Sequence, residues 1–151
     1  MSGSIRLTKG IVILICVIMF SVLLCPGSLL ASEGTVYVAG NPDLYPVEYY
    51  DSETEQYAGL MPALYRMLSE KTEYTFQYLH PGDTNEQERM TKNGQVDIVS
   101  AYLEGEIDAQ YLKMPQHISR ITVDGEERDV CIAFSEIASE ELIEKVSSAL
   151  S

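Results

Sequence analysis

The sequence predicts an α/β domain whose mostly parallel sheet is flanked by helices in three layers. After residue 33, short segments of alternating apolar residues take turns with longer segments of three- and four-residue periodicity. The resulting order is strand, helix, strand, helix, strand, and turn-forming clusters of Gly, Pro and Asn separate the elements. Residues 33–151 are enough for one ordinary hydrophobic core.

The first 32 residues have the composition of an export signal. Arg6 and Lys9 precede an uncharged run over residues 10–31, and no acidic residue occurs before that run ends. This pattern is typical of a secretory signal peptide, so we predict that residues 1–32 are removed and that the domain is periplasmic or extracellular. The run is also long enough to stay as a membrane anchor, and lipidation of Cys25 is a further alternative.

The predicted domain is strongly acidic. All 23 acidic residues but only 8 of the 10 basic residues follow residue 32, which gives this part a net charge of −15. Such a surface repels nucleic acid and anionic lipid, so we expect no nucleic-acid partner and membrane contact only through the N-terminal segment. Cys131 stands alone in an apolar pattern typical of core, and no metal-ligand spacing occurs, so we expect no metal and no cofactor.

The first half of the domain begins with a strand that ends abruptly in a loop. Alternating β-branched and aromatic residues predict the strand, and Gly40, Pro42 and Pro46 prevent any regular element from continuing. The predicted elements are strand 35–39, loop 40–46, a hairpin of 47–50 with 57–60, helix 61–72 and strand 73–79.

The second half contains two helices, a buried strand and a hairpin. Thr84 with Gln87 suggests a capping box that opens a helix ending near Asn93, and Gly94 suits its left-handed end. Ser139 can cap the last helix. The remaining predicted elements are strand 96–102, a weakly patterned stretch 103–119, a hairpin of 120–123 with 128–134 around Asp124-Gly125, and helix 139–150.

Four segments resemble a known family in their order and spacing: residues 35–49, residues 57–64, Asn93-Gly-Gln-Val-Asp-Ile-Val, and residues 129–135 followed by 139–146. Together they resemble the extracytoplasmic solute-binding proteins of ABC transporters, specifically family 3. The resemblance covers about residues 35–102 and 129–150. It implies a type II periplasmic-binding-protein fold, a role in small-molecule, amino-acid-type uptake or sensing, and a membrane permease or receptor as partner.

The sequence departs from that family in two ways. The family inserts a second lobe between the third strand and the closing strand, but here residues 103–128 hold only 26 residues. We therefore predict a single lobe, 33–151, with 103–128 as a short connector, and a homodimer or partner that supplies the missing wall. We expect no enzymatic activity, because the missing lobe removes the closure that catalysis needs.

The second departure concerns the ligand. Residues 100–109 lack the Arg that grips a carboxylate in the family, and Glu104, Glu106 and Asp108 would repel one. The alternative function is therefore a truncated or degenerate lobe acting as a protein-interaction or sensory accessory domain without ligand transport.

The candidate ligand-binding residues follow from the predicted topology. Loop residues Asn41, Asp43 and Tyr45 and strand-end residues Ser100 and Tyr102 should meet at one sheet edge, because parallel neighbours end there. An acidic and aromatic pocket would suit a cationic or sugar-like ligand. The alternative is that the prolines stiffen a turn while Tyr45 covers the core.

Other polar residues have simpler expected roles. Thr84 lies where the resemblance implies a ligand platform, with helix capping as its alternative. Glu48, Tyr49 and Tyr50 are predicted to belong to the hairpin, and His80 and His117 to the surface.

Overall fold

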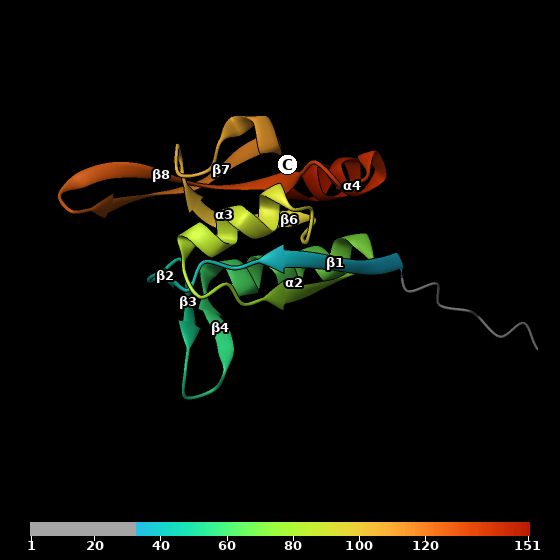
Figure 1. Cartoon of the computed structure of the whole chain (residues 1–151). Helices are drawn as coiled ribbons and strands as arrows, with labels where there is room; N and C mark the ends of the chain where they lie inside the picture. Colours follow the sequence, from blue (N-terminus) through green and yellow to red (C-terminus); the bar gives the residue numbers. More distant parts are fainter. Residues whose placement is uncertain (1–32) are drawn as a thin grey trace, which may run out of the picture. The chain divides into compact units, whose positions relative to one another are not determined.

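The computed structural model describes residues 33–151, drawn in colour in Figure 1. The predicted signal peptide, its alternative as an anchor over residues 10–31 and the lipidation of Cys25 all fall outside the described residues. Within residues 33–151, no helix combines the length and apolar character needed to cross a membrane.

A five-stranded sheet forms the centre of the domain. Its strands are β1 (Glu33–Ala39), β5 (Tyr74–Leu79), β6 (Ile98–Leu103), β7 (Leu112–Val123) and β8 (Glu126–Ser135), in the order β5-β1-β6-β8-β7. Strand β1 pairs in parallel with β5 and β6, whereas β8 is antiparallel to both β6 and β7. All strands of this sheet except β8 therefore run in one direction, which confirms the predicted mostly parallel sheet.

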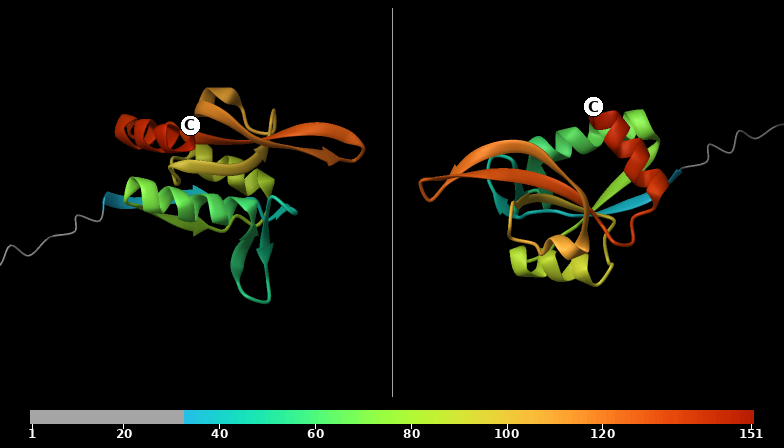
Figure 2. Two further views of the ribbon diagram at one scale, coloured as in Figure 1. Left: turned by 180° about the vertical axis from the view of Figure 1, so that it is seen from behind. Right: turned by 90° about the horizontal axis from the view of Figure 1, so that it is seen from above.

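Helices cover both faces of the sheet, and this gives the three predicted layers. Helices α2 (Leu60–Thr72) and α4 (Glu140–Leu150) pack on one face, and α3 (Thr84–Lys92) lies on the other (Figure 2). The apolar side chains of α2 and α4 meet the larger core cluster of the sheet, of which the largest fully buried members are Phe134, Met61, Leu68, Ile98 and Ile132.

The start of α3 corrects one prediction. Thr84 is not the capping residue, because Asp83 lies in extended backbone before the helix and its carboxylate accepts from the N–H of Glu86 at 2.8 Å. The Glu86 carboxylate in turn accepts from the N–H of Gly82 at 2.9 Å. Gln87, the other half of the predicted box, is buried and turns towards the sheet instead. The predicted Ser139 cap is confirmed, since its hydroxyl accepts from the N–H of Leu142.

A second, small sheet follows β1. The predicted hairpin is confirmed as β3 (Glu48–Asp51) and β4 (Gln56–Gly59), and the short strand β2 (Asp43–Leu44) adds to it from the predicted loop. This hairpin leads directly into α2 (Figure 1).

The predicted connector over residues 103–128 needs a correction. It contains the short helix η1 (Ala109–Tyr111) and strand β7, which pairs with β8 as an edge of the main sheet. Two register shifts and a left-handed Met114 interrupt the alternation of β7, and this conceals the strand in the sequence. Asp124 and Gly125 form the predicted turn with positive φ at both residues. That residues 103–128 replace a second lobe stays a prediction.

Candidate functional site at the carboxyl edge of the sheet

The topology marks one edge of the sheet as the place for a site. Strand β1 has β5 on one side and β6 on the other, and the connecting helices α2 and α3 lie on opposite faces. In open α/β sheets, ligands bind at the carboxyl ends of the strands where the connections diverge in this way. Here that point is formed by the loop after Ala39 and the end of β6.

A β-bulge shapes the end of β6. Val99 pairs with Ala133 and Tyr102 with Cys131, so β6 has one more residue between these pairs than β8 has. Ala101 adopts a left-handed φ of 45° there. The bulge withdraws this segment from regular pairing, and the carbonyl of Ala101 instead accepts from Nδ2 of Asn41 at 2.8 Å.

A fully buried carboxylate, Glu48, joins the elements at this edge. Its Oε2 accepts from the backbone N–H of Asn41 at 2.6 Å. Its Oε1 accepts from the Tyr78 hydroxyl at 2.6 Å and from the Ser100 hydroxyl at 2.8 Å. The three donors come from the loop after β1, from β5 and from the bulge of β6, so Glu48 links the small hairpin to three parts of the main sheet.

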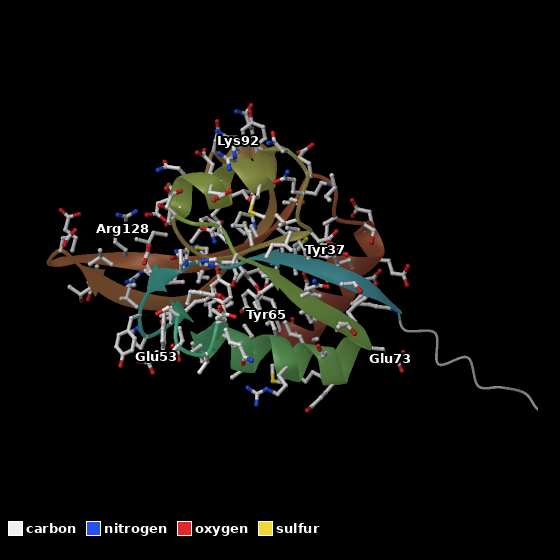
Figure 3. The ribbon with its side chains drawn as sticks, turned by 60° about the horizontal axis from the view of Figure 1, so that its bottom comes forward. Tyr37, Glu53, Tyr65, Glu73, Lys92 and Arg128 are labelled. Atoms are coloured by element: carbon white, nitrogen blue, oxygen red, sulfur yellow. The ribbon has the colours of Figure 1, made fainter. Side chains whose placement is uncertain are left out.

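The electrostatics of Glu48 are unusual for a carboxylate. Burial raises its pKa from 4.5 to about 7, although its three hydrogen bonds act in the opposite direction. Burial and the nearby Glu48 charge also raise the pKa of Tyr78 and of Tyr65. Tyr65, on α2, is buried between that helix and the sheet, and its hydroxyl has no hydrogen-bond partner within residues 33–151 (Figure 3).

These pKa values predict that the stability of the domain depends on pH. The folded state holds the Glu48 proton up to about pH 7, whereas the unfolded chain loses it near pH 4.5. The stabilising contribution of this proton is therefore complete below about pH 4.5 and is lost as the pH rises to about 7. We expect the free energy of unfolding to fall by roughly 3 kcal/mol across this window.

Urea unfolding at a series of pH values measures this dependence, with Glu48→Gln as the matched variant. The amide of this variant does not titrate, and the hydroxyls of Tyr78 and Ser100 can rotate to accept from it. The difference in unfolding free energy between wild type and variant should change with pH only between about 4.5 and 7. A difference that is constant over this range would contradict a raised pKa at Glu48.

The structure brings together some of the predicted site residues and separates others. Asn41 and Ser100 are buried and both donate to Glu48. Asp43 is exposed, and its backbone N–H donates to Oδ1 of Asn41 at 3.0 Å. Tyr45 is 74% exposed, so it does not cover the core as the alternative supposed. Thr84 is exposed in the first turn of α3.

Tyr102 lies in a separate pocket beside the end of β6. Its side chain and Cys131 are almost completely buried, and both belong to the smaller core cluster of the sheet. The pocket has a volume of about 370 Å³, and its lining is Tyr102, Glu104, Gly105, Ile107, Asp108, Ala109, Leu112, Pro115 and Cys131. The lining contains two carboxylates and no Lys or Arg, and Arg128 donates to the backbone carbonyl of Glu104 at 3.1 Å.

Sequence reasoning missed Glu48 and Tyr78 as parts of this edge. Their sequence pattern predicts only strands, and the structure pairs Glu48 with Gly59 in the hairpin. The available sequence signal for Glu48 was its place two residues after Pro46 and opposite Gly59 in the predicted hairpin. This signal does not show that the Glu48 side chain is buried.

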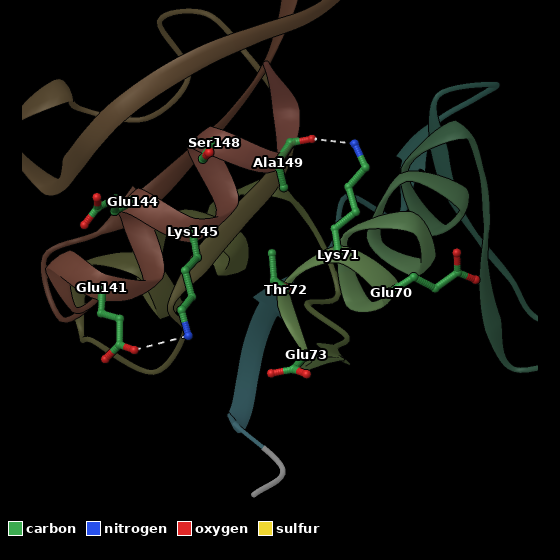
Figure 4. A pocket seen from close by; sticks show the side chains of 9 residues that line it. All are labelled: Glu70, Lys71, Thr72, Glu73, Glu141, Glu144, Lys145, Ser148 and Ala149. Carbon is green, nitrogen blue, oxygen red and sulfur yellow. Dashed lines mark hydrogen bonds and ion pairs between the residues drawn. The ribbon is translucent and has the colours of Figure 1, made fainter. Parts of the chain in front are cut away.

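Another hollow among the described residues lies away from this edge. It has a volume of about 730 Å³ and lies between the carboxyl-terminal end of α2 and one side of α4 (Figure 4). Lys71 donates to the carbonyl of Ala149 across it, and Lys145 pairs with Glu141 at 3.2 Å. Because residues 70–73 precede β5, this hollow is at the amino end of the parallel strands, opposite to the candidate site.

Comparison with known proteins gives a structural match but no sequence match. No protein-family model matches the chain, and no curated protein does. A crystal structure of the arginine-bound form of domain 1 from TmArgBP matches with a TM-score of 0.59 and 14% identity, covering 80% of this chain and 94% of that one. A mutant form of the same domain gives a TM-score of 0.60. The B. pertussis BvgS periplasmic domain matches with a TM-score of 0.64 and 11% identity, over 77% of this chain and 40% of that one.

The chain has the fold of a single lobe of a periplasmic binding protein. The match to domain 1 of TmArgBP extends over nearly the whole of that domain, which agrees with the predicted single lobe. At these low identities the comparison establishes the fold.

Proposed function

We propose that residues 33–151 form an extracytoplasmic solute-binding-like domain for the uptake or sensing of a small amino-acid-type solute with a cationic group. The pocket at the end of β6 carries this proposal, because its rim holds Glu104 and Asp108 and its inner wall holds Tyr102. Carboxylates attract an amine or guanidinium, and an aromatic ring face attracts the same groups. We propose binding rather than catalysis, because the exposed carboxylate rim leaves the pocket open to water.

A structural neighbour supports binding by one lobe alone. That neighbour is described as the arginine-bound form of domain 1 from TmArgBP, so a single domain of this fold holds a cationic solute there. In this chain the pocket has no Lys or Arg to pair with a carboxylate, and its own carboxylates would repel one. A solute that carries the cation but lacks the carboxylate should therefore bind best.

Thermal unfolding of the protein with four solutes tests the proposal. Agmatine is arginine without its carboxylate, and arginine, glutamate and glucose complete the panel, each at about 5 mM. A ligand that binds only the folded state raises the melting temperature, and tighter binding raises it further. We expect agmatine to raise it most, arginine less and glutamate not at all; a rise with glucose alone would point to a sugar ligand instead.

A matched pair of variants tests whether agmatine binds in the Tyr102 pocket. Glu104 is exposed, so Glu104→Gln removes one rim charge without disturbing the core. Glu127→Gln makes the same charge change on β8, outside the pocket lining. We expect the first variant to weaken agmatine binding by about two- to fivefold and the second to leave it unchanged. Equal effects of both variants would mean that only the overall charge attracts the solute.

A protein-interaction or sensory accessory domain without ligand transport is the second candidate. The polar groups of Asn41 and Ser100 at the sheet edge are already satisfied within the domain, by Glu48, Ala101 and Asp43, and this favours a lobe that presents a surface to a partner. The likeness to the BvgS periplasmic domain also supports this candidate. If this candidate is right, no solute in the panel stabilises the protein, and sedimentation velocity shows a homodimer. If the protein is a monomer, the partner of this candidate is a membrane permease or receptor.

A further inference from the structure

Four aromatic rings meet between the small hairpin and the end of β5. Tyr50 of β3 stacks on His80 with 3.8 Å between ring centroids, and Tyr57 of β4 stacks on Tyr78 of β5 at 4.5 Å. The Tyr57 hydroxyl lies 3.0 Å from Nδ1 of His80 and joins the two stacks. The three tyrosines are only partly buried and His80 is exposed, so the cluster reaches the surface.

These rings line a pocket that is separate from the Tyr102 pocket beside the end of β6. Its volume is about 350 Å³, and its lining is Tyr50, Glu55, Gln56, Tyr57, Pro62, Tyr78 and His80. No lining residue is shared with the Tyr102 pocket. Glu55 supplies the one carboxylate of the lining, and the lining contains no Lys or Arg.

Contacts with the backbone and with Glu48 fix the rings of Tyr57 and Tyr78. A Cβ at Gly40 would lie 2.5 Å from the Tyr57 ring and 2.9 Å from Tyr78, so these rings pack directly on the glycine backbone. The Tyr78 hydroxyl is fixed by its hydrogen bond to buried Glu48. Rings that are already ordered lose little conformational freedom when a ligand binds, and this favours binding.

We propose that this aromatic pocket is a binding site for a small organic cation of the quaternary ammonium type. Ring faces attract cations through their quadrupole, and the attraction is strongest for cations that shed water easily. Glu55 adds a full negative charge at the rim, and Pro62 adds an apolar surface for methyl groups. This site is independent of the solute proposed for the Tyr102 pocket.

Choline and its neutral isostere 3,3-dimethylbutan-1-ol test the proposal, because they share a shape and differ in charge. Titration of the protein with each, followed by the NMR signals of the tyrosine and histidine rings, gives the two affinities. We expect choline to bind about three- to thirtyfold more tightly than the isostere, with the largest shifts at Tyr50, Tyr57 and His80. Equal affinities, or no shifts with choline at about 10 mM, would overturn the proposal.

Two variants confine the result to this pocket. Tyr50→Leu removes one stacked ring, and Glu55→Gln removes the charge while leaving every ring in place, so the second variant stays informative if the first disturbs the hairpin. We expect each to weaken choline binding by at least about threefold. Glu127→Gln, which makes the same charge change on β8 outside both pocket linings, should leave choline binding unchanged. If Glu127→Gln weakens choline binding as much as Glu55→Gln does, only the overall charge attracts the cation and the proposal is wrong.

Discussion

Replacing Glu48 by Ala is expected to lower the free energy of unfolding by about 3–5 kcal/mol. The substitution leaves the buried N–H of Asn41, the buried hydroxyl of Ser100 and the partly buried hydroxyl of Tyr78 without their shared acceptor. Each unsatisfied buried donor costs about 1–3 kcal/mol, and water entering the new space recovers part of this. Urea unfolding followed by circular dichroism measures the loss.

Two further variants test whether the loss comes from the network. Glu53→Ala truncates an exposed Glu of the same hairpin and should change stability by no more than about 0.5 kcal/mol. Glu48→Gln keeps the shape and the hydrogen-bonding capacity, so it should retain most of the stability that Glu48→Ala loses. A loss below about 1 kcal/mol for Glu48→Ala would show that the carboxylate does not hold the hairpin to the sheet.

Gly59→Ala is expected to destabilise the protein by about 3 kcal/mol or more. Gly59 has a φ of 109° and a ψ of −159°, a conformation in which an L side chain is strained. An added Cβ would also lie 2.6 Å from the carbonyl oxygens of Pro46 and Val47. This backbone cannot move aside cheaply, because the Val47 carbonyl accepts the hydrogen bond from the N–H of Met61 at the start of α2.

Substitutions at two other glycines separate the two causes of the stability loss in Gly59→Ala, which are conformational strain and the close approach of the added Cβ. Gly125 has a φ of 85° and open space where a Cβ would lie, so Gly125→Ala introduces conformational strain alone and should cost about 1 kcal/mol. Gly34 has neither constraint, so Gly34→Ala should be close to neutral. If Gly59→Ala costs no more than Gly125→Ala, the close approach to Pro46 and Val47 contributes nothing.

The local pattern of the sequence predicts much of the fold. The helix over residues 61–72, the strands on either side of it and the Ser139 cap all agree with the structure, because periodicity and capping depend on residues a few positions apart. A prediction is wrong by one residue where two neighbouring residues give the same local signal. Asp83 and Thr84 are both good capping residues, and only the extended backbone of Asp83 decides between them.

The candidate site could be predicted only in outline. The convergence of Asn41 and Ser100 follows from parallel pairing, and the structure places both beside one carboxylate. The bulge at Ala101 and the strand β7 could not be foreseen, because each breaks the regular alternation on which strand prediction depends.

By itself, the sequence determined the order of the elements, the acidic character of residues 33–151 and the lack of Arg in residues 100–109. Only the tertiary structure decided that Glu48 is buried and that its carboxyl group accepts hydrogen bonds from three segments of the chain. Its donors lie 7, 30 and 52 positions away along the chain. Contacts over such separations depend on how strands pair and helices pack, whereas a periodic pattern reports only the near neighbours of a residue.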